Sequence, residues 1–194
     1  MPRIADEKAE VEGVLSVARA MAVAARTAPK ARGVDAIETL IVYGDDLKEL
    51  AEATKKQGSK FSSSLEASFG RDAENIRASN AVLLIGLRDL GPKKPENPLD
   101  CGACGHGDCA EFLTIKKSKG KSFPGPVCLF QAVDLGIALS AASSVAARFH
   151  ADNRMMYTAG SAACNLGWMK SQIIIAIPLS CSGKSIYFDR EPAT

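Results

Sequence analysis

The sequence predicts an α+β fold in which a small antiparallel or mixed sheet packs with helices and carries an inserted cysteine-rich segment. Short runs of Ile, Leu and Val indicate strands, and longer stretches with apolar residues three and four apart indicate helices. Four of the six cysteines are confined to residues 98–128, directly after a stretch with three prolines that indicates a linker. We therefore expect one core domain made of residues 1–97 and 129–194, with residues 98–128 as an insert.

The first half of the chain predicts alternating helices and strands. Residues 7–25 are Ala-rich with apolar positions at helical spacing, and a proline-containing loop leads from them to an apolar strand at 36–43. Residues 45–57 begin with acids, end with lysines and stop at a glycine, as a helix does. A polar helix at 62–79 and a fully apolar, buried strand at 81–87 complete this half.

The second half predicts a short helix in the insert and a long helix in the core. The short helix opens at Cys109 and runs through a group of lysines to Gly120, and the long helix covers residues 132–149. A further helix at 153–165 and a last core strand at 172–177 follow.

Small residues in the long helix fall four apart and therefore share one face. They are Ala132, Gly136, Ser140 and Ser144. Such a face lets another backbone approach closely, either in ordinary helix packing or across a two-fold dimer. We expect a homodimer through this face.

The spacing of the cysteines predicts a [4Fe-4S] cluster. Cys101, Cys104 and Cys109 form a C-x2-C-x4-C loop, and Cys128 follows after eighteen residues. One tight loop with three thiols, completed by a distant fourth, is typical of cluster ligation. Glycines between the cysteines leave room for backbone N–H groups to approach the inorganic sulfides.

Zinc and disulfides are the alternative interpretations of these cysteines. A four-cysteine zinc site uses the same ligand atoms, but it more often has two C-x2-C pairs, and the second pair is missing here. Six cysteines among 194 residues are far below the density of a disulfide-stapled secreted domain. The two remaining thiols, Cys164 and Cys181, are isolated and are expected to be small buried core residues.

Charge and composition limit the partners. The formal net charge of +2 gives no electrostatic case for nucleic acid. A local group of lysines, Lys116, Lys117, Lys119 and Lys121, is interpreted as a solvated helix end, and the alternative is a docking patch for an acidic redox partner. The N-terminal residues lack the apolar core of a signal peptide, and the most apolar stretch carries charges. We expect no membrane span and a cytoplasmic protein, because unpaired thiols suit a reducing compartment.

The cysteine loop resembles the small 4Fe-4S domain of corrinoid iron-sulfur proteins over residues 98–128. A wider resemblance, to a prokaryotic family of ferredoxin-domain-containing proteins, covers nearly the whole chain. Its matching segments are residues 33–35, the cysteine loop, residues 152–160, and residues 177–180 leading to residues 183–190. This resemblance implies the cofactor more directly than it implies the reaction.

The order of elements also resembles the nitroreductase fold, in which an N-terminal helix, an Ala-Pro loop and a strand precede a central helix. That fold implies FMN bound at a dimer interface. Its Arg-Arg-Ser opening and its Asn-x-Gln-Pro-Trp segment are absent here. We expect FMN around the loop at 26–35, close to the cluster, with Lys184 and either Arg26 or Lys30 holding its phosphate.

These features together predict an electron-transfer protein or oxidoreductase. The cluster takes single electrons, and a core site, with FMN as its expected cofactor, exchanges them with a redox partner protein or a small-molecule acceptor. The alternative is a non-enzymatic binding or redox-sensing protein that carries the cluster. The cysteine spacing does not separate the two, because the potential of a cluster depends on hydrogen bonds and solvent access.

Overall fold

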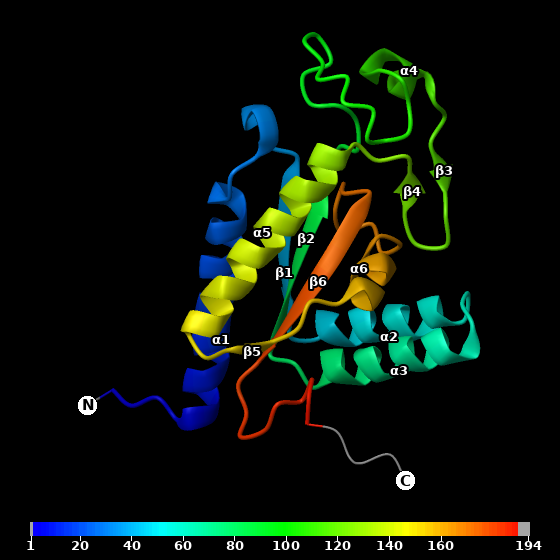
Figure 1. Ribbon diagram of the computed structural model, residues 1–194. Helices are drawn as coiled ribbons and strands as arrows, with labels where there is room; N and C mark the ends of the chain where they lie inside the picture. Colours follow the sequence, from blue (N-terminus) through cyan, green and yellow to red (C-terminus); the bar gives the residue numbers. More distant parts are fainter. Residues whose placement is uncertain (1, 190–194) are drawn as a thin grey trace.

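A four-stranded antiparallel sheet lies at the centre of the protein (Figure 1). The computed structural model describes residues 2–189. The strands run in the order β1-β2-β6-β5. They are β1 (Ile37–Tyr43), β2 (Ala81–Leu87), β5 (Asp152–Asn153) and β6 (Ile173–Ser180). The expected α+β class with a small sheet is confirmed.

The register of the strands defines two ends of the sheet. At one end Ile37 of β1 pairs with Leu87 of β2, which pairs with Ile173 of β6. The chain leaves this end after β2 to form the cysteine segment, so we call it the cysteine end. At the other, distal end, Ala81 pairs with both Tyr43 and Leu179.

Two layers of helices cover the two faces of the sheet (Figure 1). One layer holds α1 (Asp6–Thr27) and α5 (Leu129–Arg148), and the other holds α2 (Asp46–Gly58), α3 (Ser63–Arg77) and α6 (Tyr157–Ala163). Along β2, Leu83 and Ile85 pack in the first core, whereas Val82 and Leu84 pack in the second. Both faces are buried, so β2 is apolar at every position and its sequence does not alternate.

Close backbone packing joins α6 to the sheet. A Cβ atom placed on Gly160 would lie 2.0 Å from the carbonyl oxygen of Ile174 in β6. A Cβ on Gly86 of β2 would lie 2.5 Å from the Cβ of Ser171. Only glycine leaves room for these approaches.

The cysteine segment forms a separate excursion beyond the cysteine end of the sheet, at the top of Figure 1. It contains α4 (Cys109–Thr114) and a hairpin of β3 (Ser118–Lys119) and β4 (Pro124–Gly125). A 3-10 turn, η1 (Ala31–Gly33), lies between α1 and β1. The backbone N–H of Cys128 donates to the carbonyl of Leu90 at 2.8 Å, so the two ends of the excursion meet. The boundaries at 98 and 128 stay a prediction.

Two local predictions are wrong. The helix that opens at Cys109 ends at Thr114 rather than among the lysines, because Ile115 turns extended and Ser118–Lys119 pair in the hairpin. The helix expected from 153 begins at Tyr157, since residues 152–153 add β5 to the sheet edge. Residues 186–188, which follow β6, form a turn closed on Ser185.

The α5 helix is long and apolar enough to cross a membrane by length and composition, and is the one such helix found within residues 2–189. In the structure its inner face packs against α1 and the sheet. Asp134, in the second turn of α5 and on that inner face, is 1% exposed and paired with a lysine. A core helix of this kind satisfies the same criteria as a membrane span.

Candidate functional site

The four predicted cluster cysteines line one small cavity at the cysteine end. Cys101, Cys104 and Cys109 come from the loop and from the first residue of α4, and Cys128 stands directly before α5. Pro92, Gly102, Asp108, Phe112 and Leu129 complete the lining. The fold thus joins thiols that are far apart in the chain, while their role as ligands stays a prediction.

Carboxylates hold the loop in shape. The side chain of Asp108 caps α4 by accepting from the N–H of Glu111 at 2.7 Å. The carboxylate of Asp100 accepts from the N–H of Cys109 at 2.8 Å and so closes the loop on itself. Gly102 and Gly105 have φ angles of +69° and +87°, which a side chain would disfavour. The loop is therefore folded by its own backbone and acids.

The four thiols match the ligands of an iron-sulfur cluster, whereas the volume of the cavity does not match its size. The cavity measures about 10 Å³, close to the space of one water molecule, and no group of three or more His, Cys, Asp or Glu within residues 2–189 has the arrangement of a metal site. Cys101 is exposed and Cys104 and Cys109 are half-buried, whereas Cys128 is buried. A four-iron cluster is larger than this cavity, so it is the set of four thiols, and not the volume, that supports a cluster here.

Two local effects act on charge at this cavity. The N-terminus of α5, a helix of 20 residues, begins next to Cys128 and favours an anionic group there. Partial burial raises the pKa of the Cys109 thiol. Thiolates are the form that binds metal, so metal binding at this thiol would release its proton.

A buried ion pair lies beneath the cysteine segment, and sequence reasoning missed it. Nζ of Lys93 lies 2.7 Å from Oδ2 of Asp134, and their side chains are 1% and 2% exposed. The other oxygen of Asp134 accepts from the N–H of Ala31 at 2.9 Å, and Lys93 donates to the carbonyl of Val34 at 2.7 Å. The pair therefore ties the start of the segment to α5 and to the loop after α1. The sequence feature that indicates this ion pair is a single acid, Asp134, within an otherwise apolar helix.

The structure does not bring the three predicted phosphate partners together. Arg26 pairs with Asp35, and Lys30 donates to the carbonyls at the end of α1, at 2.8 Å for Ala25. Burial lowers the pKa of Lys30. Lys184 follows β6 and lies beyond the distal end of the sheet, whereas Arg26 and Lys30 precede β1 at the cysteine end. Within one chain, a single phosphate group therefore does not contact Lys184 together with Arg26 and Lys30.

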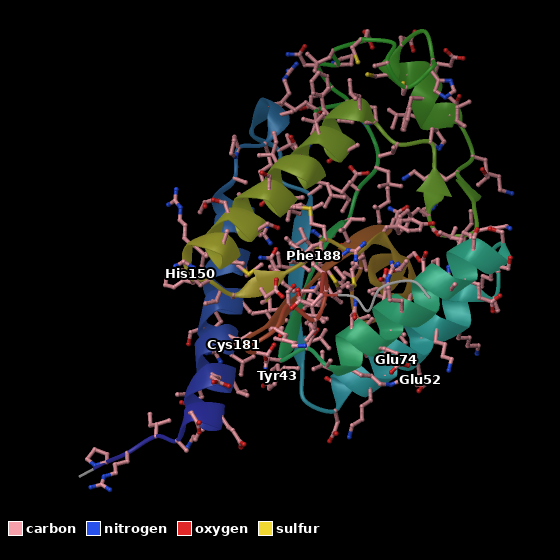
Figure 2. The ribbon with its side chains drawn as sticks, turned by 60° about the horizontal axis from the view of Figure 1, so that its bottom comes forward. Tyr43, Glu52, Glu74, His150, Cys181 and Phe188 are labelled. Carbon is pink, nitrogen blue, oxygen red and sulfur yellow. The ribbon has the colours of Figure 1, made fainter. Side chains whose placement is uncertain are left out.

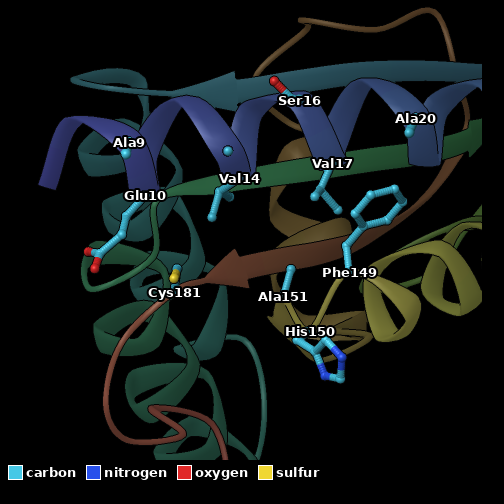
Figure 3. A pocket seen from close by; sticks show the side chains of 11 residues that line it. Ala9, Glu10, Val14, Ser16, Val17, Ala20, Phe149, His150, Ala151 and Cys181 are labelled. Atoms are coloured by element: carbon cyan, nitrogen blue, oxygen red, sulfur yellow. The ribbon is translucent and has the colours of Figure 1, made fainter. Parts of the chain in front are cut away.

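A large apolar cavity lies near the distal end, between α1 and the segment that follows α5 (Figure 3). Its volume is about 600 Å³, in the range of small-molecule and cofactor sites. Gly13, Val14 and Val17 form one wall, and the Phe149 ring points toward α1. The remaining lining residues are Ala9, Glu10, Ser16, Ala20, His150, Ala151 and Cys181.

The polar groups of this cavity come from elements far apart in the sequence (Figures 2 and 3). His150 follows α5 with a φ angle of +55°, a left-handed backbone conformation that residues other than glycine rarely adopt. Cys181 follows β6 and is exposed, so the expectation that it is a buried core residue is wrong. Cys164 is half-buried beside the second core, and burial raises its pKa to about 11.

The C-terminal part of the chain matches a family model over residues 124–190. The description of that family is "Uncharacterized protein containing a ferredoxin domain (DUF2148)". A protein of Archaeoglobus fulgidus is 42% identical over 187 residues, which covers 93% of this chain and 94% of the relative. The chain belongs to the ferredoxin-domain-containing family. Residue 190 lies outside the described part of the chain, and the family match contains Cys128 but not the loop with the other three cysteines.

Solved structures with a similar fold include nitroreductases and a nitroreductase-like protein. A nitroreductase-like protein of Bacillus cereus has a TM-score of 0.55 at 9% identity, with 100% of this chain and 94% of that chain covered. A nitroreductase of Desulfitobacterium hafniense with bound FMN has a TM-score of 0.53 at 14% identity, with 94% and 81% covered. The chain spans 61% of the length of nitroreductase A of Vibrio parahaemolyticus, which it matches with a TM-score of 0.51 at 10% identity over 95% of this chain. These likenesses confirm the nitroreductase-like core of this ferredoxin-domain family member.

Proposed function

We propose that the protein is an iron-sulfur redox protein whose four cysteines, Cys101, Cys104, Cys109 and Cys128, hold a [4Fe-4S] cluster. The observation that carries the proposal is that thiols from a loop, a helix start and a distant helix cap line one cavity. When bound, a cluster of this kind supplies one-electron transfer. The chain contributes the thiols, the positive end of α5 and the apolar ring of Phe112 at the cavity wall.

The test is the iron and sulfide content of protein purified without oxygen. We expect about four irons and four sulfides per chain, and loss of both when any of the four cysteines is replaced by Ser. Cys164→Ser and Cys181→Ser are the matched controls and keep the iron. Stoichiometric zinc in protein that never met oxygen would overturn the proposal. Iron that cannot be reduced would select the binding or sensing alternative.

We further propose that FMN occupies the apolar cavity between α1 and Phe149, rather than the loop at 26–35. The cavity offers the volume and the apolar walls that a flavin ring needs. Lys184 lies three residues after Cys181, in the loop at the same end of the sheet. Arg26 and Lys30 are already engaged within the chain. When bound, FMN supplies electron exchange with a small-molecule acceptor.

Titration with FMN at micromolar concentration tests this site. Lys184→Ala is expected to weaken binding about tenfold, the loss of roughly one charge-assisted contact, while Lys30→Ala leaves it unchanged. Ala20→Trp places a bulky side chain in the cavity and should abolish binding without altering the iron content. If Lys30→Ala weakens FMN binding as much as Lys184→Ala does, the result would contradict this site and favour the loop after α1.

The outer face of α5 supports the proposal of a homodimer. Leu129, Val133 and Ile137 follow one another at helical spacing and are 43%, 43% and 37% exposed. The small residues expected to form a close contact stand beside them, and a Cβ on Gly136 would meet no atom within 4 Å. Among the residues that the structure describes, no element of the same chain covers this face of apolar and small residues. We propose that a second copy of the chain packs against it.

A further inference from the structure

Seven lysines of the protein are concentrated in two segments that contain no acid. Residues 53–65 hold Lys55, Lys56 and Lys60, and residues 112–133 hold Lys116, Lys117, Lys119 and Lys121. All seven are exposed. The whole chain carries a formal net charge of +2, so the rest of it carries 2 − 7 = −5. The positive charge is therefore local and not general.

The fold joins these two segments through a buried glutamine. Gln57 of α2 is 3% exposed and donates from Nε2 to the carbonyl of Lys121 at 2.8 Å. Its Oε1 accepts from Nζ of Lys60 at 2.6 Å and from Nδ2 of Asn165 at 3.2 Å. Lys119 in turn reaches Oδ1 of Asn165 at 3.4 Å. Lysines from α2 and from the hairpin thus lie on one surface, although more than fifty residues separate them.

Aromatic packing fixes the hairpin against the core. The ring centroids of Phe123 and Tyr157 are 5.7 Å apart, and Ser122 hydrogen-bonds the hydroxyl of Tyr157. Phe69 packs edge-on against Tyr157 and stacks on Phe61, over which the ammonium of Lys121 lies at 5.5 Å. In Figure 1 the hairpin stands next to the turn between α2 and α3. The surface is therefore held in place before any partner arrives.

The lysine charges lack acidic neighbours within the chain. Within residues 2–189, none of the seven lies within 4.0 Å of a carboxylate oxygen. A hollow of about 310 Å³ opens between α2 and α6, lined by Lys56, Lys60, Gln57 and Asn165 together with Ala53, Ala162 and Leu166. Acidic side chains of a partner could enter this hollow and meet both ammonium groups.

We propose that Lys56, Lys60, Lys119 and Lys121 form a docking surface for an acidic one-electron carrier protein, a partner that rests on the redox function proposed above. The chain links this surface to the cysteine cavity, because the hairpin follows α4, which begins at Cys109, and leads on to Cys128. Ammonium groups on flexible stems give fast, salt-sensitive steering rather than a tight fit, as a transient electron carrier requires.

The surface suits an acidic protein better than a nucleic acid. Neither lysine-bearing segment contains an arginine, the residue that dominates phosphate and base recognition. The aromatic rings pack mainly on one another instead of facing outward as a row: Phe69 is fully buried, and Tyr157, although 40% exposed, packs edge-on with Phe69 and Phe123. The net negative charge of the rest of the chain would repel a long polyanion.

The experiment measures binding of an acidic plant-type ferredoxin to the full-length protein at low and high salt. Replacing the four lysines by Glu, K56E/K60E/K119E/K121E, should weaken binding at least tenfold at about 50 mM salt, and the difference should vanish near 1 M salt. The matched control is K8E/K48E, two exposed lysines of α1 and α2 outside this surface. We compare it with K119E/K121E, which changes the net charge equally, and expect the control to alter affinity less than twofold.

Each outcome decides the proposal. Equal weakening by K119E/K121E and K8E/K48E would show that only net charge matters and would overturn it, as would tighter binding of a 20-base-pair DNA duplex than of ferredoxin. Unfolding of the fourfold variant leaves the two double variants K56E/K60E and K119E/K121E as the test. Iron content is measured on the same samples. Absence of iron with intact, lysine-dependent docking would reject the cluster and not the docking surface.

Discussion

The buried pair of Lys93 and Asp134 gives the sharpest test of how the cysteine segment is anchored. Asp134→Ala removes the partner of an ammonium group whose side chain is 1% exposed. At the separation of 2.7 Å, two unit charges attract by about 6 kcal/mol with an effective dielectric constant of 20. The cost of burying both charges offsets much of this, and breaking one such pair destabilises proteins by about 3–5 kcal/mol.

The expected loss can be measured by urea or thermal unfolding. For a chain of this length, about 3–5 kcal/mol corresponds to a fall in Tm of roughly 6–20 °C. The double variant K93M/D134L removes both charges and keeps the volume, so it should recover most of the loss. Asp45→Ala, which breaks an exposed pair with Lys48, is the matched control and should leave Tm nearly unchanged.

Anchoring by this pair would be contradicted if Asp134→Ala lowers Tm no more than Asp45→Ala does. The same holds if K93M/D134L is as unstable as Asp134→Ala, because the loss would then come from packing and not from an unpaired charge. Limited proteolysis of the single variant adds a local measurement. Release of the pair should expose the cysteine segment to cleavage before the core unfolds.

Three further predictions follow from the packing and the thiols. Gly160→Ala should destabilise the protein by about 3 kcal/mol or more, because the added Cβ would clash with the backbone of β6. Gly13→Ala, at an exposed and open helix position, should stabilise it by about 0.5–1 kcal/mol. The urea midpoints of the two variants measure the difference. Gly136→Leu fits the single chain but blocks a helix contact, so light scattering should show monomers that remain folded, and a monomeric wild type would end the dimer proposal. Burial raises the pKa of the Cys164 thiol to about 11, so the unfolded chain loses this proton at a lower pH than the folded chain does. The contribution of this thiol to the free energy of unfolding therefore disappears between about pH 8.5 and pH 11. Over that range Cys164→Ala should lose less stability than wild type, and iodoacetamide should label Cys181 before Cys164.

The elements that the sequence predicts well are those whose pattern is local. Residues 81–87 are apolar throughout because helices cover both faces of β2, and the predicted bounds match the observed strand. The helix predicted at 45–57 lies at Asp46–Gly58, since its acids and lysines mark its own ends. The two-residue strand β5 and the hairpin after α4 were missed because pairing with distant segments, and not local propensity, creates them.

In the candidate site, too, local features can be predicted from the sequence, whereas contacts between distant elements cannot. Cysteine spacing identifies the thiols that the fold gathers at one cavity, because ligand spacing is a local signal. The pairing of Lys93 with Asp134 and the engagement of Lys30 by the end of α1 depend on contacts between elements. A basic residue in a loop does not reveal from sequence whether its charge is already bound, as Lys30 is, or at which end of the sheet it lies, as Lys184 does.

The length of β2 has a consequence for how electrons could travel. Seven residues of an antiparallel strand separate the cysteine end from the distal end by about 20 Å, so within one chain the thiols and the apolar cavity stand far apart. The α5 helix spans the same gap, with Cys128 at its first end and Phe149 at its last. In a two-fold dimer whose α5 helices run antiparallel, the first end of one helix would lie beside the last end of the other. With the cluster, the flavin and the dimer that we propose, the shorter path between the two cofactors would then cross from one subunit to its partner.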